Sequence, residues 1–385
     1  MKRISLIAIM ALMGIGSVAA KSSTTLPIVG EVVKATNPLI QYVGRVSFAK
    51  NETASFNFPG TSLRARFPGS SLKMICRPMT GYFMAQVDGC EPFKVGFNAE
   101  RDSVVTVAAA LPKGEHQVKL MYVIEGLFRT PEFRGFVLDK GCSLVKSPDL
   151  PERKIEFIGN SITCGYGVES IEMTDPFEDE TENHWLTYAN IVSDSLNAQH
   201  TSISRSGIGV YRNYDGPKAG SDENMPWQYE YTLFNKHDEK WDFNKYQPQL
   251  VCINLGTNDL STNNYDIALY EKNYRMFLTT VRSKYPNAKI VLITGPMLGE
   301  KESGEQREVL DRICSDANKK GFTLPEEMRK ARKGKNKGDK DIYRFDFTFQ
   351  TGDLGYGASW HPSKLQHQKM ADELLPFLRN LMGWE

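Results

Sequence analysis

The chain has 385 residues, which is long for one domain and favours two. Its 47 Lys and Arg and 46 Asp and Glu residues leave a formal net charge of +1, so the whole molecule has no field that would attract nucleic acid or an anionic membrane. With 41% hydrophobic and 24% charged residues, the composition is typical of a soluble globular protein.

The first twenty residues differ from the rest of the chain. Met1–Ala20 contains two cations, an apolar stretch over residues 4–13 and small residues that end at Ala20. This layout predicts a signal peptide over residues 1–20, cut after Ala20, and hence a secreted or periplasmic protein. The apolar stretch is short for a retained anchor, which needs roughly 20 residues, and no later segment is apolar enough for a span. We therefore expect no membrane insertion.

Residues 26–149 read as short strands separated by turns. Many segments alternate polar and apolar residues, and Gly, Pro, Asn or Asp occupy the breaks between them. Many strands at short intervals, without a convincing helix, predict a β-sandwich or jelly roll. The expected strands lie within residues 42–48, 54–58, 62–67, 82–89, 103–108, 116–125 and 133–139.

Residues 152–385 follow a Pro-containing polar connector and have a different pattern, in which apolar strand-like runs alternate with helical stretches. This alternation predicts a parallel sheet with helices on both faces, whose ligands bind at the carboxyl ends of the strands. The expected strands are 154–159, 200–204, 250–256, 289–297 and 342–349, and the expected helices are 183–196, 265–285 and 369–382.

Two charged segments interrupt the second half, the acidic residues 169–183 and the basic residues 329–341. We expect both to be solvated loops and assign no partner to either. The six cysteines are scattered without a scaffold-like spacing, so most are expected to be free and buried, with a disulfide in the N-terminal half left open.

Four polar or glycine positions follow predicted strands or precede the last helix. Ser161 follows "EFIGN", Gly207 follows "TSISRS", Asn258 lies in "LGTND" and His361 lies in "GASWHPS". A serine nucleophile needs a base for its proton and donors for the oxyanion, and these positions offer both. Each alone has a plain structural explanation, such as a turn or an Asx-type cap. Their joint occurrence in this order predicts a serine-hydrolase site.

The blocks "IGNSIT", "SRSGIG", "LGTND" and "WHPS" together resemble those of the SGNH (GDSL-type) hydrolases, serine esterases on a flavodoxin-like three-layer α/β fold. A jelly-roll-like region ahead of such a domain is similar to carbohydrate esterase family 2. Those acetylxylan esterases remove acetyl groups from plant polysaccharides and prefer 6-O esters. The resemblance implies an acetylated polysaccharide or oligosaccharide as substrate and no cofactor.

The resemblance also implies the roles of single residues. Ser161 is the expected nucleophile and His361 the expected general base. The expected oxyanion hole consists of the backbone N–H groups of Ser161 and Gly207 and the side-chain amide of Asn258, with Gly209 as an alternative to Gly207. A glycine lets a substrate carbonyl approach the backbone closely.

Two departures from the family pattern concern acids. Asn160 stands where the motif has aspartate, and Ala358 and Ser359 stand where an aspartate usually precedes the histidine. Asp353 is the nearest upstream acid, with no clear reason to reach the ring. We therefore predict a Ser161–His361 dyad whose imidazole is oriented by a backbone carbonyl of residues 358–360, an arrangement known in some esterases of the resembled family.

Other candidates are weaker. His367 is expected to be a surface residue, and Trp360, Trp227 and Tyr166 could each stack on a sugar ring or pack in the core. No metal site is expected, because no His or Cys pair has ligand spacing. Two other functions stay open: an SGNH lipase, thioesterase or lysophospholipase for longer acyl chains, and a glycan-binding module. The polysaccharide and the oligomeric state are not predicted.

Overall fold

The computed structural model describes residues 28–101, 103–126, 129, 131–234, 236–262, 264–320 and 339–385. The predicted signal peptide, residues 1–20, lies outside these residues, as does most of the basic segment 329–341. The acidic segment 169–183 is mostly exposed or half-buried, but the prediction of a solvated loop is wrong at its end, where Glu182 and Asn183 are fully buried.

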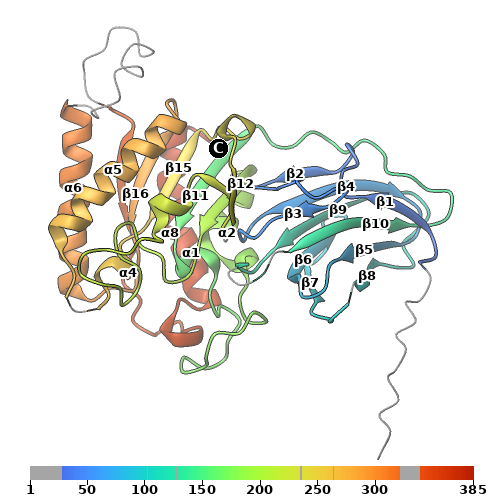
Figure 1. The fold of residues 1–385 in the computed structure, drawn as a ribbon, viewed down its shortest axis with the longest axis horizontal. Coiled ribbons are helices and arrows are strands. Elements are labelled where there is room, and N and C mark those ends of the chain that lie inside the picture. Colours follow the sequence, from blue (N-terminus) through green and yellow to red (C-terminus); the bar gives the residue numbers. More distant parts are fainter. Residues whose placement is uncertain are drawn as a thin grey trace, which may run out of the picture.

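The first half of the chain forms two antiparallel sheets packed face to face (Figure 1). One has the order β1-β10-β5-β8, with β3 also paired to β10, and the other has the order β2-β4-β9-β6-β7. Alternate residues along the strands point into one shared core, which contains Phe83, Leu120 and Phe136. The predicted β-sandwich is confirmed. Its strands are Glu31–Lys34 (β1), Gln41–Val43 (β2), Ala54–Ser55 (β3), Ser62–Pro68 (β4), Leu72–Cys76 (β5), Gly81–Val87 (β6), Phe93–Phe97 (β7), Ser103–Ala108 (β8), Glu115–Tyr122 (β9) and Glu132–Leu138 (β10).

The second half contains a parallel sheet with the order β12-β11-β15-β16-β17. Counted along this domain, that order is 2-1-3-4-5, which is the flavodoxin-like arrangement. The strand order reverses beside β11, so the loops after β11 and β15 diverge at a topological switch point. The strands are Arg153–Gly159 (β11), Ala198–Ser204 (β12), Leu250–Asn254 (β15), Lys289–Thr294 (β16) and Ile342–Asp346 (β17), and a separate hairpin joins Tyr231–Leu233 (β13) to Lys236–Lys240 (β14).

Helices cover both faces of this sheet (Figure 1). Ile155 and Phe157 of β11 pack with α2 and α8, whereas Ile158 points to the opposite face, which packs with α5 and α6. The predicted three-layer α/β fold is therefore confirmed. The helices are Ser161–Cys164 (α1), Tyr188–Ser195 (α2), Met225–Gln228 (α3), Thr257–Leu260 (α4), Ile267–Lys284 (α5), Glu300–Lys320 (α6) and Lys364–Met382 (α8), with 3-10 turns at His184–Leu186 (η1), Phe243–Lys245 (η2) and Ala358–Trp360 (η3).

The single helix expected over residues 183–196 is two separate elements, because the segment contains two capping residues, Asn183 and Thr187. Asn183 caps η1 through the N–H of Trp185, and Thr187 caps α2. Trp185, expected on the helix face, instead packs against the core of the first domain with Lys119 over its ring, 4.4 Å from the centroid. Strands β1, β5 and β7 and helix α6 have no counterpart in the prediction.

The described residues include all six cysteines and no disulfide joins any of them, and Cys76, Cys164 and Cys252 are buried. Among the helices of the described ranges, none combines the length and apolarity that crossing a bilayer requires.

Candidate active site

Three neighbouring strands of the parallel sheet end at the same level. Gly159 on β11 pairs with Ser204 on β12 and with Asn254 on β15. The loops that follow carry Ser161, Gly207 and Asn258, so strand register alone brings these predicted residues to one edge of the sheet.

Ser161 begins α1 directly after a tight strand-to-helix turn. A Cβ at Gly159 would lie 2.1 Å from Thr163 Oγ1, so a larger residue could not make this turn. The Asn160 side chain caps the helix by accepting the N–H of Ile162 at 3.0 Å. The neutral asparagine therefore supplies a cap through its side-chain oxygen, and the serine side chain remains available to its neighbours.

Ser161 and His361, which lie 200 residues apart in sequence, share a hydrogen bond of 2.8 Å between Ser161 Oγ and His361 Nε2. His361 Nδ1 lies 3.0 Å from the carbonyl oxygen of Ala358 and 3.2 Å from that of Ser359. Because carbonyl oxygens only accept, the ring proton is on Nδ1, and Nε2 accepts the serine hydroxyl. Asp353 accepts the hydroxyl of Thr351 and is not a partner of the imidazole.

The turn before His361 has an unusual backbone. Ser359 and Trp360 both have left-handed φ values, 49° and 59°, which cost energy for residues other than glycine. This turn directs the carbonyls of residues 358 and 359 at Nδ1. Desolvation of the imidazole lowers the pKa of His361 to about 4, although the two carbonyl hydrogen bonds act in the opposite direction.

The loop after β12 is held from two sides. The Asn258 amide donates to the carbonyl of Ile208 at 2.8 Å, which leaves its second N–H for another acceptor. The neighbouring Asp259 is buried and accepts the backbone N–H groups of residues 210, 211 and 212 at 2.8–3.1 Å.

Gly207 and Gly209, the two alternatives in this loop, differ in their surroundings. The Gly209 N–H donates to Asn213 Oδ1 at 3.1 Å, and a Cβ there would lie 1.9 Å from the carbonyl oxygen of Arg212. Gly207 has a φ of +75°, and the space where its Cβ would lie is open except for Tyr214 at 4.0 Å. Within the described part of the chain its N–H has no protein partner.

The three aromatic candidates are placed differently. Tyr166 stacks on His361, with ring centroids 4.1 Å apart, and is itself covered by Phe177. Trp360 adjoins the histidine and is 52% exposed. Trp227 packs against His237 of the β13–β14 hairpin, with centroids 3.6 Å apart, and among the described residues it makes no ring contact with the site.

His367 is not the surface residue that was expected. It is fully buried in α8, and its Nδ1 accepts the N–H of Tyr188 at 3.3 Å. His367 was expected inside the last helix, and it does lie in α8, but its side chain faces Tyr188 of α2 rather than solvent.

A cavity of about 590 Å³ adjoins these groups at the junction of the two domains. Tyr166, Phe177 and Ser206 line it from the second domain, and Tyr82 and Asn98 line it from the first. Acidic side chains at 125 and 178–180 and Arg129 complete its walls.

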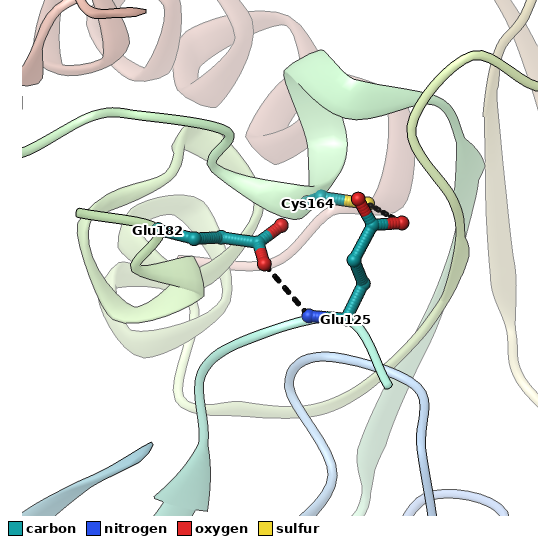
Figure 2. A group of neighbouring side chains, drawn as sticks. All are labelled: Glu125, Cys164 and Glu182. Carbon is teal, nitrogen blue, oxygen red and sulfur yellow. Dashed lines mark hydrogen bonds between the residues drawn. The ribbon is translucent and has the colours of Figure 1, made fainter. Parts of the chain in front are cut away.

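Sequence reasoning missed several residues around the site. Glu125, Cys164 and Glu182 form a buried group, with potential ligand atoms within 4.8 Å of one another (Figure 2). They have no ligand-like spacing, so no sequence signal joins them. Asp259 stands beside Asn258 in the quoted block, which was the one available signal for its structural importance.

The chain matches two family models along its length. Residues 42–148 match the model described as "Carbohydrate esterase 2 N-terminal", and residues 155–374 match "GDSL-like Lipase/Acylhydrolase". The two matches correspond to the β-sandwich and to the α/β domain.

Similar proteins and structures agree with these models. The chain is 34% identical over 351 residues to the cellulase/esterase CelE of Acetivibrio thermocellus, covering 90% of this chain but only 40% of that protein. It is 27% identical to an acetylxylan esterase / glucomannan deacetylase of Cellvibrio japonicus, covering 91% of each. A solved family two carbohydrate esterase from Clostridium thermocellum, in complex with cellohexaose, superposes with a TM-score of 0.79 at 34% identity, covering 90% of this chain and all of that one.

Proposed function

Because this chain belongs to carbohydrate esterase family 2, we propose that it removes acetyl groups from plant polysaccharides such as acetylated xylan or glucomannan. The observation that carries the proposal is the hydrogen bond of 2.8 Å between Ser161 Oγ and His361 Nε2, together with an Nδ1 that faces only carbonyl oxygens. A hydroxyl bonded to an unprotonated imidazole nitrogen is ready to attack an ester carbonyl.

In the first step, Ser161 Oγ attacks the acetyl carbonyl while His361 Nε2 takes its proton. The negative charge that develops on the carbonyl oxygen is received by the N–H groups of Ser161 and Gly207 and by the Asn258 amide. His361 then gives its proton to the departing sugar hydroxyl, which leaves an acetyl group on the serine.

In the second step, water attacks the acetyl-serine and His361 acts as base again. The imidazolium that forms in each step is stabilised by the carbonyl dipoles of residues 358 and 359 in place of a carboxylate. Dipoles stabilise a cation less than a full charge does, but an ester with a sugar leaving group demands less of the base than an amide.

The surroundings of the dyad suit a saccharide. The exposed Trp360 offers an aromatic face beside the histidine, whereas the ring of Tyr166 is covered by His361 on one side and Phe177 on the other. The adjoining cavity has both aromatic and carboxylate walls. We propose that on hexose units, such as those of glucomannan, the 6-O acetyl group is removed first, because the resembled esterases prefer such esters. Trp227 is left out of this binding surface because it packs against the hairpin.

We further propose that the protein is exported. The pattern of residues 1–20 supports this location, which is also where a plant polysaccharide would be encountered.

The test measures acetate release from acetylated xylan and glucomannan by the native chain, Ser161→Ala and the control Ser195→Ala, whose serine is exposed at the end of α2. The native chain and the control are expected to be active, and Ser161→Ala is expected to lose at least about 10³-fold in kcat. Equal release by the native chain and Ser161→Ala would overturn the mechanism. NMR of a partly deacetylated glucomannan that carries 2-O, 3-O and 6-O acetyl groups identifies the position removed, whereas xylan, whose pentose units lack a 6-hydroxyl, cannot report on it. Loss of 2-O or 3-O groups from glucomannan before 6-O groups would overturn the 6-O preference.

Two further measurements separate the remaining functions. Rates on 4-nitrophenyl esters from acetyl to octanoyl are expected to fall with chain length, and a rise would indicate a lipase or thioesterase. Retention of glycan by the native chain without any hydrolysis would indicate a binding module.

A further inference from the structure

A buried group of three side chains (Figure 2) contacts the loop that carries Gly207, through Ser206. Glu125 comes from the segment that follows β9 in the first domain, Cys164 ends α1, and Glu182 lies in the loop before η1. Their exposed fractions are 6%, 0% and 0%. The group therefore joins the β-sandwich to the helix that begins at Ser161.

Glu125 makes the central contacts. Its Oε2 accepts the backbone N–H of Ser206 at 2.7 Å, and the thiol of Cys164 points to the same oxygen at 4.0 Å. Its own N–H donates to Glu182 Oε2 at 2.8 Å. One carboxyl group of the first domain thus touches both the nucleophile helix and the loop that carries Gly207.

Hydrogen bonds link the three side chains, and burial favours their protonated forms. Burial raises the pKa of Glu125, and burial together with the nearby Glu125 carboxyl raises the pKa of Glu182 well above its usual range. Burial likewise raises the pKa of the Cys164 thiol, and the nearby Glu125 carboxyl acts in the same direction. Glu182 Oε1 has no partner among the described residues and is the natural position for a proton on this pair.

The contact with Ser206 matters because of the backbone beside it. The peptide between Ser206 and Gly207 carries the Gly207 N–H, and open space surrounds the Gly207 Cα, so side-chain packing does not hold it. The peptides on either side are both anchored. The Ser206 N–H is bonded to Glu125, and the Gly207 carbonyl accepts the N–H of Tyr214 at 2.8 Å.

We propose that Glu125 of the β-sandwich domain is a positioning residue for the oxyanion hole. It fixes the Ser206 N–H and thereby the direction of the Gly207 N–H. The first domain thus completes the active site of the second, and the hydrolytic domain alone would have a misplaced oxyanion donor. This inference rests on the proposed function.

The experiment compares Glu125→Leu, Glu125→Asp and Glu125→Gln in the full chain. Leucine removes the oxygen that accepts the Ser206 N–H. Aspartate keeps a carboxyl group, but its side chain is shorter by one methylene. Glutamine keeps a carbonyl oxygen on a side chain of the same length. With 4-nitrophenyl acetate, kcat is expected to fall at least about tenfold for leucine and to fall for aspartate, with KM little changed. Glutamine is expected to remain within about threefold of the native chain. A misplaced donor should cost less than the roughly 10²–10³ that follows its complete loss.

Glu132→Leu is the matched control, because Glu132 is another buried glutamate of the same domain, held by Lys50, Arg77 and Arg134 away from the site. It is expected to lower Tm while kcat is retained. Should Glu125→Leu fail to fold, the comparison of aspartate with glutamine still decides.

Unchanged kcat in Glu125→Leu and Glu125→Asp would overturn the inference. So would an equal loss in Glu125→Gln, or the same loss in Glu132→Leu. The proposed function fails separately, if the native chain releases no acetate from polysaccharide. Because 4-nitrophenyl acetate requires no glycan contacts, it reports on Glu125 in either case.

Discussion

The imidazole of His361 is desolvated, and its hydrogen-bond partners are an uncharged hydroxyl and two backbone carbonyls. Within the described ranges, no neighbouring carboxylate therefore stabilises its protonated form. Burial holds its pKa near 4, against an ordinary value of 6.5. The base is neutral and active above its pKa and protonated below it. We therefore expect kcat/KM to stay level as pH falls from 7 to about 5 and to drop by half near pH 4.

The measurement is acetate release between pH 3.5 and 7. Samples held at each pH and assayed at pH 7 serve as the control for unfolding, since the buried His184 also has a pKa lowered by burial to about 4. A midpoint between pH 6 and 7 would contradict the expectation. It would mean that the imidazolium is stabilised as it is in solution.

At the residue scale, the sequence located positions whose signal was local, while their roles stay predictions. Ser161, Gly207 and Asn258 each follow a strand within a few residues, so strand ends could be located and the side chains placed with them. It did not locate Glu125 or anticipate the burial of His367, because the environment of each depends on elements distant in sequence.

The turn η3 is the element that presents the histidine, and Gly167 sets its position. Gly167 has a φ of +56°, and its carbonyl accepts the N–H of Ala358 at 3.1 Å. A Cβ on Gly167 would lie 2.3 Å from the Cβ of Ala358. Any side chain at 167 must therefore push the turn away from Ser161.

We expect Gly167→Ala to lower kcat by about 10–100-fold, because a shift of about 1 Å in a reacting group has an effect of that size. Gly355→Ala is the control: its φ is +71°, and nothing lies within 4 Å of its Cβ position. It adds comparable backbone strain without a clash and should change only Tm. Kinetics on 4-nitrophenyl acetate and thermal unfolding measure both, and equal kcat values for the two variants would contradict this role of Gly167.

A helix or strand was predicted only where its apolar residues recur regularly over enough positions to stand out from the flanking sequence. Helix α5 was recognised from its regular apolar face, whereas α6 is mostly polar and buries only a narrow stripe that includes Val309, Leu310 and Ile313. The strands β1, β5 and β7 are only four or five residues long. Short elements carry too few residues to establish a period, and pairing with neighbours stabilises them in the fold.

The two domains are joined by a buried arginine. Arg45, 1% exposed and located after β2, donates to the carbonyls of Tyr229 and Tyr231 in the second domain at 2.5 and 2.8 Å. Its guanidinium lies 5.0–5.7 Å from ring centroids of both domains, at Phe58, Tyr229, Trp241 and Phe243. Such a contact couples the stability of one domain to that of the other.

We expect Arg45→Met to lower the free energy of unfolding by about 2–4 kcal/mol, since two buried carbonyls lose a charged donor. The native chain is expected to unfold in a single thermal transition, which should separate into two in the variant. Differential scanning calorimetry measures both effects. Arg66→Met is the control, because Arg66 forms an exposed pair with Glu115, and such pairs contribute little. A single, unshifted transition in Arg45→Met would contradict this role.

By itself the sequence determined the order of the two architectures, the parallel sheet and the strand ends that carry Ser161, Gly207 and Asn258, because these follow from periodicity and turn residues over short stretches. Only the tertiary structure decided which carbonyls face His361 and which of the two glycine N–H groups, at 207 or 209, is not bonded within the described residues. It also decided that the first domain contacts the loop that carries Gly207, through Glu125. The Glu125–Ser206 contact joins segments 81 residues apart, and the bond that brings His361 to Ser161 joins segments 200 residues apart. Their geometry is set by how the elements and the two domains pack rather than by any local preference of the chain.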